Sequence, residues 1–216
     1  MAGFPVGRGV FILGSAWLIV LAGGGSSFLR RPVGIVYLAL WVVWWVATFA
    51  GRRRGETTPY DRNQHAIVVV TGSVTVPLLI LAPSWEYAHF AGPLPRDGPL
   101  AWSGISLFAA GMVLQIAAMR ALGSGFTVRL GVQPGRKLVT SGPYRYIRHP
   151  GYASYLMSVS GIGFAMGSLV MFAVVLLIVP FILWRIKNEE AMLLSEFREE
   201  HSAYMRRTWR LVPFVY

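Results

Sequence analysis

Residues suited to binding an anion gather in the stretch 140–152, which lies between apolar parts of the sequence. Within it, Arg148 and His149 come directly before Pro150, a residue favoured at the first position of a helix because its missing N–H costs nothing there. Arg148 and His149 would then lie at a helix N-terminus, where free N–H groups and the helix dipole attract an anion. A basic loop at a membrane surface, with tyrosines in the interface, is the simpler alternative.

A pair of adjacent carboxylates, Glu189 and Glu190, follows the last long apolar run. Neighbours on a helix point about 100° apart, so the two side chains cannot share one face. One carboxylate could then face a site while the other pairs with a base such as Arg185, one helical turn earlier. The alternative is a solvated helix start with no binding role.

The sequence offers little support for a metal site, a nucleotide-binding loop or a catalytic nucleophile. The chain has no cysteine, and its four histidines form no pair at the spacing of metal ligands, so we expect no metal site. Residues 123–125 read Gly-Ser-Gly without the third glycine or the preceding strand of a dinucleotide loop, and we interpret them as a turn. Walker, nucleophile-elbow and His-Glu-x-x-His sequences are absent.

The composition indicates a membrane protein. Of the 216 residues, 55% are hydrophobic and 13% are charged, against about 25% charged residues in soluble domains, and the mean hydropathy is +0.53. The net charge of +11 comes from basic residues spread between apolar runs rather than from one basic domain. We therefore read it as a topology signal and expect no nucleic-acid partner.

Four uncharged or nearly uncharged segments each approach the roughly 20 residues needed to span a bilayer. They are residues 10–29, 32–51, 66–85 and 98–119. A cleaved signal peptide is the rival reading of the first. In the second, Trp41, Trp44 and Trp45 mark one helical face, which favours packing or interface anchoring.

The charge-free run 150–184 is too long for one span, since a helix of roughly 35 residues measures about 52 Å against about 30 Å of hydrocarbon. Glycines at 161, 163 and 167 indicate a hairpin of two short helices. With both termini in the cytoplasm, every Lys and Arg except Arg30, Arg31 and Arg96 then falls on the inner side. A single crossing would remove this bias, so the positive-inside rule favours the hairpin.

Residues 188–207 have the periodicity of an amphipathic helix at the inner surface. Arg206, Arg207 and Arg210, at or just beyond its end, would suit anionic headgroups. The predicted fold class is therefore all-α: a polytopic integral membrane protein with four longer transmembrane helices, a short helical hairpin and a C-terminal amphipathic interfacial helix. We divide it into N-terminal membrane helices (1–97) and a core (98–216).

From about residue 122 onward the chain resembles the isoprenylcysteine carboxyl methyltransferase family, whose wider group includes phospholipid methyltransferases. The resemblance rests on the stretch 138–152, which ends Arg148-His149-Pro150-Gly151-Tyr152, and on the glycine-containing hairpin. It rests also on Glu189-Glu190-x-x-Leu193-x-x-x-Phe197, on Tyr204, and on the closing Arg210-Leu211-Val212-Pro213.

The resemblance implies a membrane methyltransferase that uses S-adenosylmethionine, held in a cytoplasm-facing pocket that the C-terminal region closes. The implied cofactor contacts are Leu138, Val139, Gly142, Tyr144, His149, Tyr152, Glu189 and Glu190. The catalytic candidates are Arg148, Arg207 and Glu190, and the substrate-binding candidates are Tyr204 and Arg207. A carboxylate acceptor needs no general base but needs a cation to hold it, for which we name Arg148 and Arg207.

Two departures from the family pattern bear on the acceptor. Arg136-Lys137 stands where family members often have a histidine, and His201 replaces the first tyrosine of the Phe-x-x-x-Tyr-x-x-Tyr tail. Both weaken a prenylated cysteine as the acceptor. His201 could serve as a base for an amine or phenol, although a surface-helix histidine is the simpler reading.

We therefore expect a lipophilic small-molecule or lipid acceptor, with carboxyl O-methylation ahead of N-methylation, in an integral membrane protein in contact with membrane lipids. One alternative is an NADPH-dependent sterol or steroid reductase, which Arg136-Lys137 would suit. The other is a non-catalytic scaffold or transporter, which charged residues inside the spans would favour, but the four spans and the hairpin contain none.

Overall fold

The computed structural model describes residues 6–51, 77–90, 97–123 and 138–216. In these parts the chain is helical, and its only β pairing is an isolated bridge between Ile147 and Trp209. The all-α prediction is confirmed for this part of the chain. Most of the third predicted span, residues 66–85, and the pair Arg136-Lys137 lie outside the described residues.

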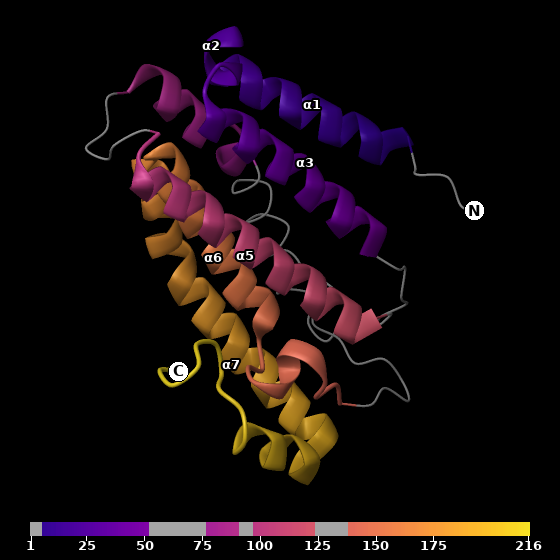
Figure 1. The fold of residues 1–216 in the computed structure, drawn as a ribbon. Coiled ribbons are helices and arrows are strands. Elements are labelled where there is room, and N and C mark those ends of the chain that lie inside the picture. Colours follow the sequence, from indigo (N-terminus) through magenta and orange to yellow (C-terminus); the bar gives the residue numbers. More distant parts are fainter. Residues whose placement is uncertain (1–5, 52–76, 91–96, 124–137) are drawn as a thin grey trace.

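The N-terminal helices differ from the first predicted span and match the second. Helix α1 covers Val6–Ala22, a turn of three glycines follows, and the short α2 covers Ser26–Leu29. Helix α3 covers Pro32–Gly51 and begins with the proline that favours a first helical turn. The two longer helices lie side by side (Figure 1). The glycines explain the early end of α1, because they break the helical hydrogen-bond pattern.

The predicted face of tryptophans is confirmed as a packing surface. Trp41 is fully buried, and its indole nitrogen donates to the Ser15 hydroxyl of α1 at 3.1 Å. Trp44 meets the ring of Phe108 on α5, the helix Pro99–Leu122, edge to face with centroids 5.6 Å apart. A single buried cluster thus joins α1 and α3 to the C-terminal half.

Helices α5 and α6 pack with unusually close backbones. Helix α6 covers Pro150–Met166, and a Cβ atom added to Gly161 would lie 2.5 Å from the backbone nitrogen of Phe108 on α5. A Cβ at Gly104 would meet the backbone nitrogen of Ala165 at 2.3 Å. Small residues let membrane helices approach this closely, and α6 is thereby fixed against α5 (Figure 1).

The predicted hairpin turn is confirmed at residues 167–168. Gly167 takes the left-handed conformation (φ 63°) that ends α6, and the Ser168 hydroxyl accepts from the Met171 amide at the start of α7. The buried Glu86 carboxylate, from the helical segment 77–89, accepts hydrogen bonds from the Ser168 hydroxyl and the Val170 amide. The turn is thus held by a residue distant in sequence.

The second helix of the hairpin is much longer than predicted. Helix α7 covers Leu169–Met205, with non-helical backbone angles at Arg198 (φ 41°, ψ −114°). The chain kinks at Arg198, and the part before the kink alone would measure about 43 Å, beyond about 30 Å of hydrocarbon. Because its charge-free part ends at Trp184, we take the polar remainder to project beyond the membrane. The predicted amphipathic segment, residues 188–207, therefore begins within this helix and contains the kink at Arg198.

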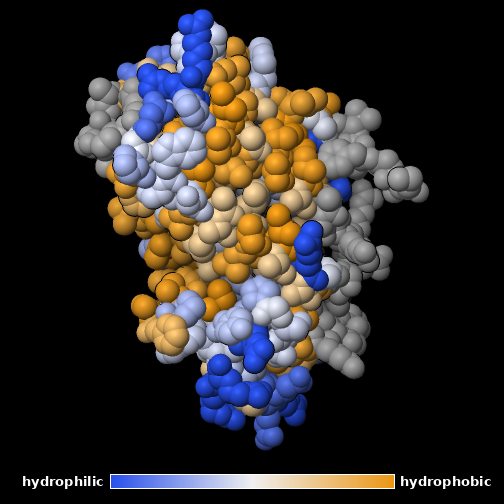
Figure 2. Space-filling model, viewed as in Figure 1, coloured by the Kyte–Doolittle hydropathy of each residue, from blue (hydrophilic) through white to orange (hydrophobic). Residues whose placement is uncertain are grey.

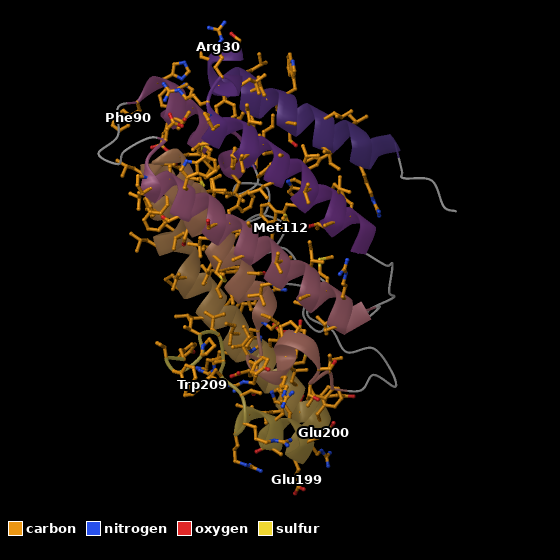
Figure 3. The ribbon with its side chains drawn as sticks, in the orientation of Figure 1. Arg30, Phe90, Met112, Glu199, Glu200 and Trp209 are labelled. Carbon is orange, nitrogen blue, oxygen red and sulfur yellow. The ribbon has the colours of Figure 1, made fainter. Side chains whose placement is uncertain are left out.

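Three of the described helices are long and apolar enough to cross a membrane: α3 (residues 32–49), α5 (99–122) and α7 (169–205). Helix α1 is apolar but shorter. A broad apolar surface covers the middle of the molecule, and hydrophilic residues gather at its two ends (Figure 2). Arg30 lies at one end, and Glu199 and Glu200 lie at the other (Figure 3).

Candidate functional site

The polar cluster forms where the chain entering α6 meets the chain leaving α7. The Arg148 amide donates to the Trp209 carbonyl at 2.8 Å, the Trp209 amide donates to the Tyr146 carbonyl at 3.0 Å, and the His149 amide donates to the Arg210 carbonyl at 3.2 Å. These three backbone hydrogen bonds join residues 146–149 to residues 209–210. Two sequence-distant segments thus form one wall beside the polar part of α7.

Glu190 is the centre of this cluster. Its side chain is 5% exposed, and its two carboxylate oxygens are each held by a different guanidinium. Arg148 Nε lies 2.8 Å from Oε1, and Arg210 Nη2 lies 2.8 Å from Oε2. His149 Nε2 lies 3.4 Å from Oε1. Charge-assisted hydrogen bonds of this kind are the strong ones, and they fix the carboxylate in place.

The environment keeps Glu190 ionised. Burial by itself raises the pKa of a carboxyl, but hydrogen bonds from His149, Arg148 and Arg210 outweigh it and lower the pKa of Glu190 to about 2. Glu190 therefore carries a full negative charge at neutral pH. That charge balances part of the positive charge around it.

Arg148 is engaged on several sides by protein groups. Besides Glu190, its guanidinium donates to the Met205 carbonyl at 3.1 Å and to the Thr208 carbonyl, and its Nη1 lies 3.4 Å from the Thr208 hydroxyl. Arg148 thus connects the start of α6 with the chain that leaves α7. Its hydrogen bonds hold these two segments together inside the cluster.

Glu189 belongs to a second, more open chain of contacts. Its side chain is 27% exposed, and its Oε2 accepts from the Tyr152 hydroxyl at 2.9 Å. Arg185 Nε donates to the same hydroxyl at 2.6 Å. Tyr152 can therefore donate to Glu189 while it accepts from Arg185.

The two carboxylates thus contact different sets of partners, as expected from the angle between neighbouring residues on a helix. The buried carboxylate, Glu190, pairs with Arg148 and Arg210. Arg185, the base suggested for the other carboxylate, donates to the Tyr152 hydroxyl, which in turn donates to Glu189. Glu189 remains the more accessible of the two acids.

The other predicted residues lie around the cluster at different depths. Tyr204 is buried, and its hydroxyl donates to the Tyr144 carbonyl at 2.7 Å, which ties α7 to the short 3₁₀ helix η2 (Gly142–Arg145). Leu138 and Val139 are half-buried on the segment before it. Arg207 lies apart: it is exposed, and its Nε donates to the Ala203 carbonyl of its own helical turn at 3.3 Å.

The N-terminus of α6 offers a backbone donor beside this cluster. His149 is the N-cap residue, and its side chain makes no capping hydrogen bond. A Cβ added to Gly151, in the first helical turn, would meet no atom of the described chain within 4 Å. Pro150 has no N–H, and the Tyr152 and Ala153 amides both donate to the His149 carbonyl at 3.1 Å, which leaves the Gly151 amide, with the favourable helix dipole, as the donor for an anion here. Anion binding at this position stays a prediction.

His201 is buried, contrary to its reading as a surface histidine. It is 1% exposed, and neither ring nitrogen has a hydrogen-bond partner among the described residues. Burial lowers the pKa of His201, so the imidazole is neutral at neutral pH. Its ring lies 5.9 Å from that of Tyr204. The helical periodicity of residues 188–207 places residue 201 on the apolar face, and this is the sequence signal that indicates its burial.

Arg210 and Thr208 were missed as site residues by reasoning from the sequence. Arg210 was read as a headgroup ligand because it lies in a basic tail, and nothing local reveals that the tail folds back onto Glu190. The backbone pairing of 146–149 with 209–210 supplies that information. No group of three or more His, Asp or Glu residues able to hold a metal occurs in the described part of the chain.

The fold and the cluster together define a helical membrane protein whose polar site is assembled at one end of a hairpin. Residues 104–195 match the model of the Isoprenylcysteine carboxyl methyltransferase (ICMT) family. The resemblance read from the motifs is thereby confirmed. The match starts earlier than residue 122 and ends before the last quoted elements, Phe197, Tyr204 and residues 210–213.

Curated relatives agree with the family match. A probable protein-S-isoprenylcysteine O-methyltransferase of Oryza sativa is 31% identical over 125 residues, covering 54% of this chain and 62% of the relative. The Dictyostelium discoideum protein-S-isoprenylcysteine O-methyltransferase is 30% identical over 139 residues, covering 57% and 54% respectively. The chain thus spans about three fifths of the length of the rice relative and about half of the other.

A solved structure has the same fold. The structure of the eukaryotic intramembrane Ras methyltransferase ICMT without a monobody superposes with a TM-score of 0.62. The superposition covers 96% of this chain and 75% of that one, at 21% sequence identity. At this identity the likeness establishes the arrangement of the helices.

Proposed function

We propose that this protein is an integral membrane methyltransferase that uses S-adenosylmethionine to methylate a carboxylate on a lipophilic acceptor. The observation that carries the proposal is the junction of the α6 N-terminus with Glu189 and Glu190, within a segment that matches a methyltransferase family. We assign both termini and this junction to the cytoplasmic side, because the positive-inside bias supports it.

The donor set fits the cofactor. S-adenosylmethionine has a carboxylate, which suits the amide and open space at Gly151, and an amino group and ribose diol, which suit a carboxylate such as Glu189. We assign the predicted contacts Leu138, Val139, Gly142, Tyr144, His149 and Tyr152 to the walls of the same pocket. When bound, the cofactor supplies an activated methyl group on its sulfonium.

We assign Glu190 and Arg148 to positioning rather than to contact with the acceptor. Both are buried in mutual hydrogen bonds, and Arg148 is further engaged by Met205 and Thr208. Methyl transfer is an in-line displacement in which the protein supplies alignment and a dry site. A carboxylate acceptor loses no proton, so none of these residues has to act as a base.

The exposed Arg207 and the buried Tyr204 remain our candidates for contact with the acceptor. Arg207 is the more accessible cation, and a flexible arginine can hold a carboxylate by a bidentate pair. The curated relatives are named for isoprenylcysteine, so a prenylated cysteine is the first acceptor to test. An apolar acceptor of this kind would reach the site from the bilayer, between helices.

The buried His201 supports a second candidate, methylation of an amine or phenol. Both of those acceptors must lose a proton, and a neutral imidazole close to Tyr204 could take it. The family match favours the carboxylate reaction over this one, and it also favours a methyltransferase over a reductase or a scaffold.

Calorimetric titration of the purified protein with S-adenosylhomocysteine, beside NADPH, tests the cofactor. We expect micromolar binding of the first and none of the second. Glu189→Gln should weaken binding by about tenfold, the loss of one charge-assisted contact. Glu199→Gln, an exposed acid on the same helix, is the matched control and should bind normally. Binding of NADPH alone would overturn the proposal.

The acceptor class can then be read from the product. Purified protein with labelled cofactor would be offered a prenylcysteine analogue, a lipophilic amine and a lipophilic phenol. A carboxyl methyl ester releases methanol in mild base, whereas N-methyl and aryl O-methyl products are stable. Base-labile label supports the carboxylate reaction, and base-stable label supports the second candidate.

A further inference from the structure

The C-terminal segment, residues 209–216, exposes apolar side chains on a tightly folded turn. The Leu211 and Val212 amides donate to the Tyr216 carbonyl at 2.7 and 2.9 Å, and the Tyr216 amide donates back to the Val212 carbonyl at 3.0 Å. The Trp209 and Phe214 rings lie 5.5 Å apart. Yet Phe214 is 86% exposed and Val215 is 78% exposed. An ordered turn with this apolar face in water would be unfavourable.

One residue fixes this turn to the side of α7. Leu211 is buried and belongs to a cluster with Ile178 and Ile182, which lie on the charge-free part of that helix. The C-terminus therefore lies beside α7 rather than at the polar tip, where Glu199 and Glu200 are found (Figures 1 and 3). The turn is thus next to helix surface that we assign to the membrane.

We propose that residues 209–216 form a foot that inserts into the membrane interface and holds the polar cluster closed. The occupant of the exposed face is the lipid bilayer, at the boundary of headgroups and acyl chains. Continuity supports this choice, because the face adjoins the apolar surface of α7, where Leu176 and Leu177 are 75% and 78% exposed (Figure 2).

The composition of the segment also fits that boundary. Trp and Tyr prefer the headgroup level of a bilayer. Trp209 and Tyr216 are each partly exposed, and the Arg210 guanidinium lies 4.9 Å from the centroid of the Tyr216 ring. A second copy of this chain would offer no such reason for Trp and Tyr to border the exposed apolar face.

Insertion would act on the site through Arg210. The same residue that touches Tyr216 at 2.6 Å in the foot also holds Glu190 Oε2 at 2.8 Å. The backbone of 209–210 accepts the amides of Arg148 and His149. Lipid contact that orders the foot therefore orders the wall of the cluster. This inference does not depend on which reaction the site performs.

The absence of cysteine from the chain gives a direct test. Phe214→Cys and, as the matched control, Glu199→Cys would each be labelled with an environment-sensitive fluorophore in lipid nanodiscs. Lipids carrying a doxyl group at the upper acyl chain should quench the label at 214 several-fold more than the label at 199. Aqueous iodide should do the reverse. Because both positions are exposed, the substitutions should not impair folding, which the thermal midpoint checks.

Two outcomes would overturn the lipid contact. Iodide quenching of the 214 label equal to that at 199, without doxyl quenching, would place the foot in water. Protection from both quenchers would mean that protein covers it. The coupling to the site is tested by hydrogen exchange at the amides of 148 and 149 in the double variant Phe214→Asp, Val215→Asp. Several-fold faster exchange in nanodiscs supports the coupling, and unchanged exchange refutes it.

Discussion

Arg210 reaches Glu190 from the far side of the cluster, and the 2.8 Å contact between them joins the C-terminal segment to α7. The opposite oxygen of the same carboxylate is held by Arg148 from the start of α6. One buried acid therefore connects three segments that are separate in the sequence. The assembly of the site depends on its charge.

Glu190→Gln should destabilise the protein substantially. The substitution keeps the size of the side chain but removes the charge that Arg148 and Arg210 share, and breaking a buried ion pair from one side costs about 3–5 kcal/mol. We expect a clear fall in the thermal midpoint in detergent. Glu199→Gln controls for the loss of an acid on the exposed part of the same helix. Equal midpoints for the two variants would contradict this role.

Acid should remove the same contribution. The folded-state pKa of Glu190 is about 2, below its ordinary value of 4.5. A lowered pKa means that the stabilisation is complete above pH 4.5 and is lost as the pH falls from 4.5 towards 2. The midpoint of the wild type minus that of Glu190→Gln, measured along a pH series, should therefore be constant near neutrality and shrink below about pH 4.5. A difference that stays constant down to pH 3 would refute the assignment.

Replacing His201 by Phe or Leu should leave stability unchanged or raise it. Its ring nitrogens are buried without partners among the described residues, and an unsatisfied buried polar group costs about 1–3 kcal/mol. An apolar side chain removes that cost. The exposed His89, replaced in the same way, should change stability by less than about 0.5 kcal/mol. A large loss at 201 alone would mean that the imidazole is hydrogen-bonded in the folded protein.

The sequence predicted which residues form the site better than it predicted which of them pair with one another. Residue spacing and the family resemblance selected Arg148, His149, Tyr152 and the two acids, and the fold brings all of these together. The partner of the buried acid was not predictable. Arg185 is one helical turn from Glu189, whereas Arg210 reaches its neighbour only because residues 209–210 pair with the chain before α6.

In the fold as well, features set by nearby residues were predictable from the sequence, and features set by distant contacts were not. Pro32, Pro99 and Pro150 each begin a helix close to the predicted start, and Gly167-Ser168 forms the predicted turn. Charge and hydrophobicity along the chain could not show that the second helix of the hairpin runs on past Trp184. Its polar part stays helical because it packs within the cluster, and its non-helical angles at Arg198 have no sequence signal that we can name.

Gly161→Ala should separate α5 from α6 and so disturb the site at the other end of the same helix. The added Cβ would meet the Phe108 backbone nitrogen at 2.5 Å and the Gly104 carbonyl at 2.8 Å, and backbone atoms cannot move aside as a flexible side chain can. Overpacking of this kind costs about 1–3 kcal/mol, more than the gain of up to about 1 kcal/mol in helix propensity.

Gly14→Ala in α1 is the matched control, because its Cβ would meet nothing within 4 Å. That variant gains helix propensity without a clash, so its thermal midpoint should stay the same or rise while that of Gly161→Ala falls. Since α6 begins at Pro150, directly after Arg148 and His149, the shift should also weaken binding of S-adenosylhomocysteine. A rise in both midpoints would show that the two helices can part without cost, and the close approach of α5 and α6 would then not be what positions the site.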